Sequence, residues 1–470
     1  MLLRMKGATA LSTECTQIGF GFHGLKKREI RGDFAGGAIS SDGGGLLLRE
    51  VDKRIGLMQQ FAGCFTDYRD PDLIEHRVEQ LVAQRVYGLA LGYEDLNDHE
   101  QLRQDPLLGV LVEKEDPGRE LLAGKSTLNR LELTAEKASA KDRYKKIVLH
   151  HEAVDRLLVD LFLQAHGEAP EQIILDVDAT DDPLYGKQEG RFFHGYYGHY
   201  CYLPLYIFCG EFLLCARLRS SNIDAASGSV EELQRMVQQI RVAWPQVRIL
   251  VRGDSGFCRE ELMAWCEGAG VDYLLGLAKN DRLKGEIKLQ MAQAQALYQQ
   301  SGKPARIFHE FHYQTRSSWK QVRRVVAKAE YLEKGENPRF LVTSLAAQPW
   351  PAQPLYEEHY CARGEMENRI KEQLSLFSDR TSTAYLRSNQ LRLYFSSMAY
   401  VLMQMFRRLG LQGTELATAQ CATIRLKLFK IGALIRITVR KVWIALSSGC
   451  PYAGLFCRIH AQLAALPLRC

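Results

Sequence analysis

The chain has 470 residues, of which 46% are hydrophobic, and it carries 61 Lys and Arg residues against 55 Asp and Glu residues. This length predicts several domains, and the hydrophobic fraction is sufficient for real cores. Because the formal net charge is only +6, the chain is not a polycation. Any surface for an acidic partner must therefore be local.

The twelve cysteines form no CxxC pair and no Cys/His spacing typical of zinc sites. They predict reduced thiols, without a disulfide framework or structural zinc. The N-terminus has no signal-peptide pattern. The most apolar run, LYFSSMAYVLMQMF, is shorter than the roughly 18–20 residues of a membrane span. We expect a cytoplasmic protein of bacterial type with no membrane partner.

Residues 1–60 are predicted to form an N-terminal arm and residues 61–165 a helical, DNA-binding region with apolar residues at helical spacing. Within it, GRELLAGKST (118–127) nearly matches a phosphate-binding P-loop. However, five residues instead of four separate its glycines, and no apolar strand precedes it. We interpret it as an exposed turn whose Lys125 and Arg130 face DNA phosphates, and we expect no nucleotide partner.

The pattern changes from helix to strand near residue 172. IILDVDATD predicts a strand with Ile174, Asp176 and Asp178 on one face. Two apolar segments joined by a short turn at Gly210 then predict an antiparallel meander. In the helix that follows, Ser229 and Glu232 predict a capping box.

The next segment, VRILVRGDSGF (247–257), is typical of a strand that is buried on both faces and ends in Asp254. A helix and another apolar strand follow it. This order of elements resembles RNase H-like domains, in which the first and fourth strands are neighbours. We therefore predict an α/β fold for residues 166–282. It is an RNase H-like mixed sheet of three antiparallel strands and then two parallel strands, flanked by helices.

Neighbouring strands would bring Asp178 and Asp254 together at one edge of the sheet, where open α/β sheets place their sites. Two close carboxylates repel each other unless a cation neutralises them. Mg²⁺ prefers oxygen ligands and usually takes one or two protein carboxylates. The sequence thus favours a Mg²⁺ site, with Asp176 as the alternative first aspartate. For Asp254 the alternative role is to cap the following helix.

Residues 283–345 predict a β-rich insertion that begins with a polar helix. Its basic and aromatic residues suit contact with a nucleic-acid backbone and stacking on bases. Alternatively, Trp319 fills the core of the insertion. The candidate residues are Arg316, Trp319, Lys320, Arg323 and Arg324.

Residues 346–410 are predicted to complete the core. In HYCARGEMENRIKEQLSLF, offsets of three and four place Tyr360, Arg363 and Glu367 on one helical stripe, with Lys371 one turn further. An exposed helix with ordinary ion pairs would have a similar pattern.

Residues 411–470 form a C-terminal region that we assign to dimerisation or DNA contact. There, IRITVRKVWIAL predicts one half-buried strand, with Ile435, Ile437 and Val439 opposite a basic face. A solvated edge strand is the alternative.

The blocks LDVDAT, VRGDSGF and Y-x2-R-x3-E, in this order, resemble the catalytic blocks of DDE transposases from bacterial insertion sequences. The specific resemblance is to the group-one transposase DDE domain, which has a β-rich insertion between the second Asp and the Glu. It extends to residues 76–106, 182–190 and 389–402, and it covers most of the chain.

This resemblance implies that Asp178, Asp254 and Glu367 are catalytic. They would hold two Mg²⁺ ions, about 3.5–4 Å apart, for which Mn²⁺ can substitute. The ions would activate water, and then the freed 3′-OH, for phosphoryl transfer.

The resemblance also implies that Tyr360 and Arg363 contact transposon-end DNA. Trp319 resembles an aromatic residue that some relatives stack on a flipped base. Related transposases often have a basic residue seven positions after the Glu, where this chain has Leu374. Lys371 is the candidate substitute.

We therefore predict a transposase that binds the terminal inverted repeats of its insertion sequence, cuts DNA at the element ends and joins the 3′-OH ends to target DNA. Its partners would be double-stranded DNA and a second copy of the chain in a synaptic complex. The alternatives are an RNase H-like nuclease without strand transfer and an inactive, transposase-derived DNA-binding protein.

Overall fold

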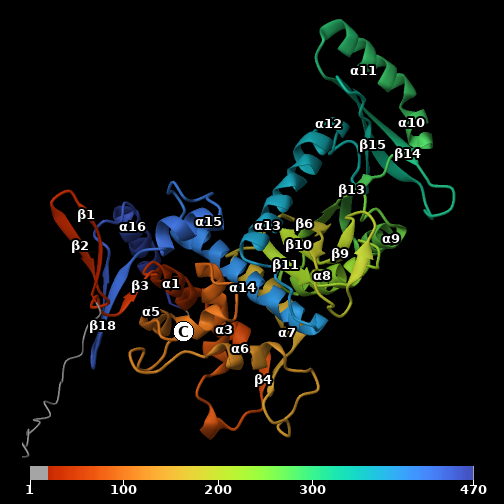
Figure 1. Ribbon diagram of the computed structural model, residues 1–470. Helices are drawn as coiled ribbons and strands as arrows, with labels where there is room; N and C mark the ends of the chain where they lie inside the picture. Colours follow the sequence, from red (N-terminus) through yellow and green to blue (C-terminus); the bar gives the residue numbers. More distant parts are fainter. Residues whose placement is uncertain (1–18, 469–470) are drawn as a thin grey trace, which may run out of the picture.

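The computed structural model describes residues 19–468 (Figure 1). A large mixed sheet lies beside a helical body, and an extension of the sheet projects away from that body. Residues 1–18, which belong to the predicted N-terminal arm, and residues 469–470 lie outside the described residues. The prediction of a mixed α/β fold is confirmed.

The central sheet has nine strands in the described chain, in the order β11-β10-β6-β12-β13-β17-β15-β14, with β16 paired to β15. β6 runs parallel to β12, with Val177 opposite Gly253, so the predicted adjacency of these two strands is confirmed. β10 and β11 add antiparallel neighbours, and β13 is parallel to β12. The strand bounds are β6 (Gln172–Ala179), β10 (Leu205–Cys209), β11 (Phe212–Arg217), β12 (Arg248–Gly253), β13 (Asp272–Leu277), β14 (Ala305–Tyr313), β15 (Arg323–Leu332), β16 (Gly335–Glu336) and β17 (Arg339–Thr343).

The β-rich insertion continues the central sheet. β17 pairs antiparallel with β13, and β15 pairs with β17, so hydrogen bonding runs without a break from the core into the insertion. The helices α10 (Asp281–Glu286) and α11 (Lys288–Ser301) accompany these strands in the projecting arm (Figure 1). The position of the insertion is thereby fixed relative to β12.

The two faces of the sheet belong to different cores. Ile173, Leu175 and Val177 of β6 pack with α7 (His151–Gln164), α8 (Ser229–Ala243) and α9 (Glu260–Ala269). On the other face, Tyr206 and Phe208 pack with α13 (Gly364–Ser375) and α14 (Leu386–Gly410). This division follows the strict alternation of side chains along a strand.

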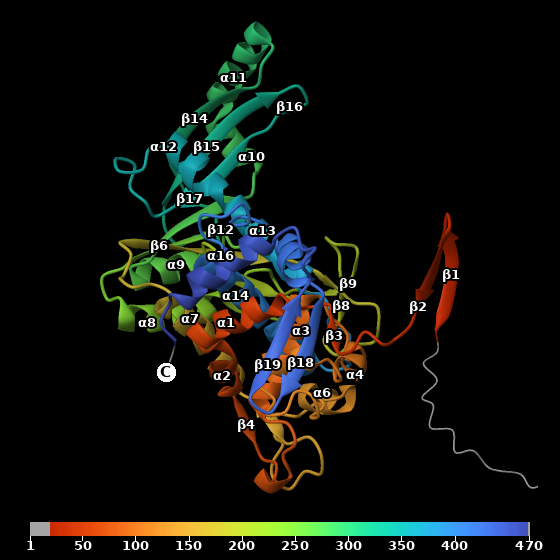
Figure 2. The same ribbon diagram turned by 90° about the vertical axis from the view of Figure 1, so that its left-hand side faces the viewer.

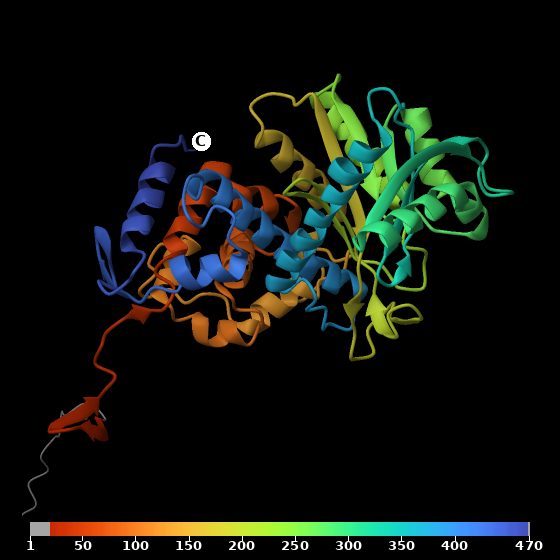
Figure 3. The same cartoon turned by 90° about the horizontal axis from the view of Figure 1, so that it is seen from above.

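The helical body is built around α14, which is buried along most of its 25 residues and packs against α3 (Figure 3). No helix among residues 19–468 is long and apolar enough to cross a membrane. The other elements of this body are α1 (Gly45–Ile55), α2 (Leu57–Ala62), β4 (Phe65–Asp67), η1 (Pro71–Leu73), α3 (Val78–Leu91), α4 (Asp98–Leu102), α5 (Pro106–Leu111), α6 (Lys125–Glu132), β5 (Ile147–Leu149), α15 (Cys421–Ile424) and η4 (Arg425–Phe429).

Segments from the two ends of the described chain share a three-stranded sheet, in the order β19-β18-β3 (Figure 2). β3 (Ile39–Ser40) pairs with β18 (Ala433–Thr438), and α16 (Ala453–Ala464) packs on α1 and α14. The prediction of one strand here was wrong. β18 and β19 (Lys441–Leu446) form a hairpin, and Val439 is fully exposed in its turn. A separate hairpin, β1 (Phe20–Leu25) and β2 (Arg28–Gly32), precedes this sheet.

Two local predictions near the core were also wrong. Gly228, with φ +77°, occupies the N-cap of α8, so Ser229 lies inside the helix and Glu232 instead accepts a hydrogen bond from Arg217. The apolar segment before Gly210 is divided at Pro204. Its first part, β9 (His199–Tyr202), joins β7 (Asp182–Pro183) and β8 (Phe192–His194) in a small separate sheet.

Candidate active site at the carboxyl ends of two parallel strands

Two aspartates lie where β6 and β12 end. Asp178 is the penultimate residue of β6, and Asp254 directly follows β12. The backbone N–H of Ala179 donates to Asp178 Oδ1 at 2.9 Å, and that of Gly256 donates to Asp254 Oδ1 at 2.8 Å. The register of the two strands thus brings both carboxylates to the same edge of the sheet.

An irregular helical segment supplies the remaining charges. It begins with α12 (Ala352–Pro354), continues through the π-helical turn η2 (Leu355–Tyr360) and the 3-10 turn η3 (Cys361–Arg363), and ends in α13. Such turns often occur at functional sites. Arg363 Nη2 lies 2.8 Å from Asp178 Oδ2, and its Nη1 lies 3.7 Å from Glu367 Oε1. Arg363 thereby links the helix to the end of β6.

Negative charge exceeds positive charge in this cluster. Burial raises the pKa of Asp178 to about 6, and the carboxylates of Asp254 and Glu367 add to the rise, although Arg363 opposes it. Burial disfavours the charged form of Arg363, but Asp178 and Asp254 outweigh that effect and raise its pKa. One guanidinium therefore faces three carboxylates, and the cluster keeps a net negative charge.

Tyr360 lies over β13 at this edge. A Cβ atom on Gly276 would stand 2.6 Å from the Tyr360 hydroxyl and 2.9 Å from the Ser255 backbone nitrogen. Only a glycine leaves room for both groups, which explains a glycine in the middle of a buried strand. Gly276 therefore positions both Tyr360 and the turn after Asp254.

Asp176, the alternative first aspartate, has a different partner. Arg252 Nε and Nη2 donate to its two carboxylate oxygens at 2.5 and 2.7 Å, and both side chains are buried. Arg252 also donates to the His359 carbonyl. Because Asp176 is buried and both of its oxygens accept hydrogen bonds from Arg252, Asp178 remains our candidate.

The model of the transposase DDE domain, group 1, matches residues 22–468. The chain belongs to this family. It is thus a DNA transposase by family, and the resemblance inferred from the three sequence blocks is confirmed.

No curated protein matches this transposase. Among solved structures, a piggyBac transposase synaptic complex with hairpin DNA matches with a TM-score of 0.42 and 10% sequence identity. The match covers 90% of this chain and 83% of that one.

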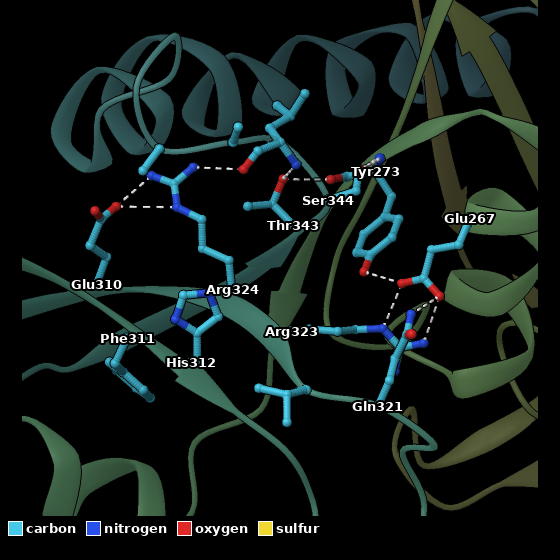
Figure 4. A pocket seen from close by; sticks show the side chains of 14 residues that line it. Glu267, Tyr273, Glu310, Phe311, His312, Gln321, Arg323, Arg324, Thr343 and Ser344 are labelled. Atoms are coloured by element: carbon cyan, nitrogen blue, oxygen red, sulfur yellow. Dashed lines mark hydrogen bonds and ion pairs between the residues drawn. The ribbon is translucent and has the colours of Figure 1, made fainter.

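Two of the insertion residues that were predicted to contact DNA, Arg323 and Arg324, are engaged inside the protein, whereas Arg316 and Lys320 are exposed. Arg323 pairs with Glu267, and Arg324 pairs with Glu310 (Figure 4). Arg323 also pairs with Glu260 of α9. These residues, except Glu260, line a pocket of about 690 Å³ on the arm. Both guanidinium groups are buried, so in this arrangement they support the insertion and do not face a DNA backbone.

Trp319 is also buried, with 6% of its surface exposed. Its ring lies 5.7 Å from the Tyr313 ring in an edge-to-face contact, and Arg323 lies over its face. This is the alternative role considered from the sequence, in which Trp319 fills the core of the insertion. By contrast, Lys371 of α13 is exposed, as is Leu374 one turn further.

The donor types at the strand ends fit a divalent cation. Asp178, Asp254 and Glu367 offer only carboxylate oxygens, which hard cations prefer. The ion pairs that Asp178 and Glu367 make within residues 19–468 share one counterion. In the arrangement described, Arg363 occupies that role. Within residues 19–468, no three His, Cys, Asp or Glu side chains form a group that could hold a metal ion.

Two residues of the site, Arg252 and Gly276, are not among those predicted from the sequence. Arg252 interrupts an apolar strand, and a lone charged residue in such a run signals a buried ion pair. Gly276 interrupts the next strand, and an interior glycine signals a close approach of another group. Both signals were present in the sequence, but neither reveals the identity of the partner.

Proposed function

We propose that this DNA transposase cuts DNA at the ends of its own element and joins the freed 3′-OH ends to target DNA. The proposal is supported by Arg363, which pairs with Asp178 and lies 3.7 Å from Glu367, and by Asp254 at the end of the neighbouring strand. Three carboxylates at a sheet edge suit transfer of a phosphoryl group, for which the protein supplies mainly positioning and charge neutralisation.

Asp178, Asp254 and Glu367 would hold Mg²⁺ or Mn²⁺, which would activate the attacking oxygen and stabilise the leaving oxygen. A bound cation would supply the positive charge that Arg363 now supplies to Asp178, so the guanidinium would be free to turn away. Once released, Arg363 and the nearby Tyr360 can donate hydrogen bonds to the phosphates of the element end.

Exposed Lys371, one turn beyond Glu367, adds a further positive charge on this helix. We infer double-stranded DNA as the partner, both at the inverted repeats and in the target. We also infer that two copies of the chain act together, since two element ends must be joined to one target.

The test uses the full chain, Mg²⁺, and DNA that carries the inverted repeats flanking its own gene. We expect cuts at the element ends and joined products with a target plasmid, and neither with Asp254→Asn. Cutting without joining would indicate a nuclease instead. Binding of the inverted repeats without any cutting by the unmodified chain would indicate an inactive DNA-binding protein.

A further inference from the structure

A hairpin next to Asp178 exposes a group of aromatic side chains that the proposed chemistry does not use. It comprises residues 184–202, here called the aromatic hairpin, and contains β8 and β9 (Figure 2). The exposed fraction is 92% for Tyr185, 58% for Phe193 and 88% for Tyr196. Phe192 and Tyr200 are each 43% exposed. Clustered exposure of large apolar rings marks an interaction surface.

The base of this hairpin is fixed to the catalytic strand. β7, which begins four residues after Asp178, pairs with β9, with Asp182 opposite Tyr202. The backbone N–H of Thr180 donates to the carbonyl of Pro204, and Asp178 itself lies opposite Tyr206 in β10. Any ligand on the hairpin is therefore held beside the candidate active site.

Hydrogen bonds at its base stabilise the conformation of the hairpin. His199 Nε2 lies 2.8 Å from Asp181 Oδ2, the Tyr202 hydroxyl donates to the carbonyl of Glu189, and Ser221 Oγ donates to that of Phe192. The aromatic rings at its outer end, by contrast, are exposed to solvent. A rigid base with exposed rings lowers the entropy lost when a ligand binds.

The charges of the hairpin favour an anionic ligand. Lys187 is exposed, and the Arg191 guanidinium lies 4.1 Å from the centre of the Tyr200 ring. The nearby acidic groups have internal partners: Asp181 pairs with His199, and Glu189 accepts a hydrogen bond from the Leu386 backbone. Positive charge and open ring faces are the combination that binds single-stranded nucleic acid.

We propose that the aromatic hairpin binds unpaired DNA bases beside the phosphodiester that is cut. Paired and stacked bases hide their faces, so an intact duplex would use only the charges of Lys187 and Arg191. Bases that are unpaired at an element end can stack on Phe193 and Tyr196 instead. The proposal rests on the proposed function, because it assigns this surface to the DNA that the active site cuts.

The test measures binding in EDTA, where no cutting occurs, by the fluorescence anisotropy of a labelled dT15 oligonucleotide and of a labelled 15-base-pair duplex. We expect Phe193→Ala/Tyr196→Ala to weaken dT15 binding at least about tenfold, the factor for one lost stacking contact. Duplex binding should change less than about threefold. Tyr196→Phe, which keeps the ring, and Tyr68→Ala, an exposed tyrosine that follows β4, should bind like the unmodified chain.

The proposal would be overturned if the double variant lost affinity for both probes equally, or if it lost no affinity for dT15. So would a change of oligomeric state in light scattering without a change in dT15 binding, because the hairpin would then be an interface between copies. These outcomes are independent of cleavage. A chain that cuts no DNA but loses dT15 binding in the double variant contradicts the proposed function and retains the hairpin assignment.

Discussion

Asp176 and Asp178 lie two residues apart on the same face of β6, and each faces an arginine, yet the two pairs are built differently. Asp176 and Arg252 form a bidentate ion pair, and both side chains are buried. Asp178 makes a single contact with Arg363, which also lies near Glu367 and feels the charge of Asp254. The first pair is complete, whereas the second leaves carboxylates underneutralised.

The role of each aspartate follows from the charge balance around it. A closed pair has no capacity for another ligand and serves the fold. A cluster with excess negative charge at a strand end favours binding of a further positive charge, such as a divalent metal ion. Asp182, four residues further along the chain, is a third case, since it is buried, accepts a hydrogen bond from Thr381 and makes no ion pair within residues 19–468.

The largest effect should follow from Asp178→Asn. We expect DNA cleavage to fall at least about 1,000-fold, because the site loses a charged oxygen ligand needed in the transition state. The urea midpoint of unfolding should not fall. Asp176→Asn is the matched change on the same strand face, and it should lower the urea midpoint through the unpaired Arg252. Cleavage by Asp178→Asn at the unmodified rate would contradict the assignment.

Arg252→Met should give the next largest effect, a loss of about 3–5 kcal/mol in the free energy of unfolding, because Asp176 is left buried without its partner. Urea denaturation measures it. The double change Asp176→Leu/Arg252→Met removes both charges and should regain most of the loss. If the double variant is as unstable as the single one, the pair does not act as a closed unit.

Asp182→Asn should stabilise the protein in a pH-dependent way. Burial raises the pKa of Asp182 to about 8, so the folded state keeps a proton that the unfolded state releases near pH 4. The stability that this proton provides is present below pH 4 and is lost as the pH rises to about 8. The variant has no such loss and should gain at least about 2 kcal/mol at pH 9 but nothing at pH 4. Equal gains at both pH values would contradict the buried-acid explanation.

The smallest effect should come from Arg363→Met, with a loss of about 1 kcal/mol in stability, because the pair is single and partly accessible to water. The three carboxylates then lack their internal cation. Ca²⁺ should therefore raise the thermal midpoint of the variant more than that of the unmodified chain. Arg369→Met, which removes an ion pair with Glu372 on the same helix, should show no added response to Ca²⁺.

Strong periodic patterns in the sequence were sufficient to predict the central strands of the core. The apolar runs at 172–180 and 247–254 predicted two strands. That the two are neighbours was predicted from the order of elements, which resembles that of RNase H-like domains. Helix start signals were less reliable. Ser229 and Glu232 match a capping box, but Gly228 adopts the N-cap conformation and Arg217 takes the carboxylate.

The sequence could not reveal which charges are used internally. Arg323 and Arg324 suit DNA contact by residue type, but their partners come from α9 and β14, far away along the chain. Likewise, the offset from Arg363 to Glu367 predicts a helical pair, yet only tertiary structure adds Asp178 to it. Pairing across long sequence separations is decided by packing, which local patterns do not encode.

The contact of β3 with β18 has a consequence for biosynthesis. Leu455, Ile459 and Leu463 of α16 are buried in the same core as Leu47 and Leu48 of α1, so this core closes only after residues 433–464 have left the ribosome. Translation that stops before them leaves apolar surface on α1 and α14 uncovered, and such products are targets for proteolysis and aggregation. Shortened products of the gene are therefore not expected to accumulate as folded protein.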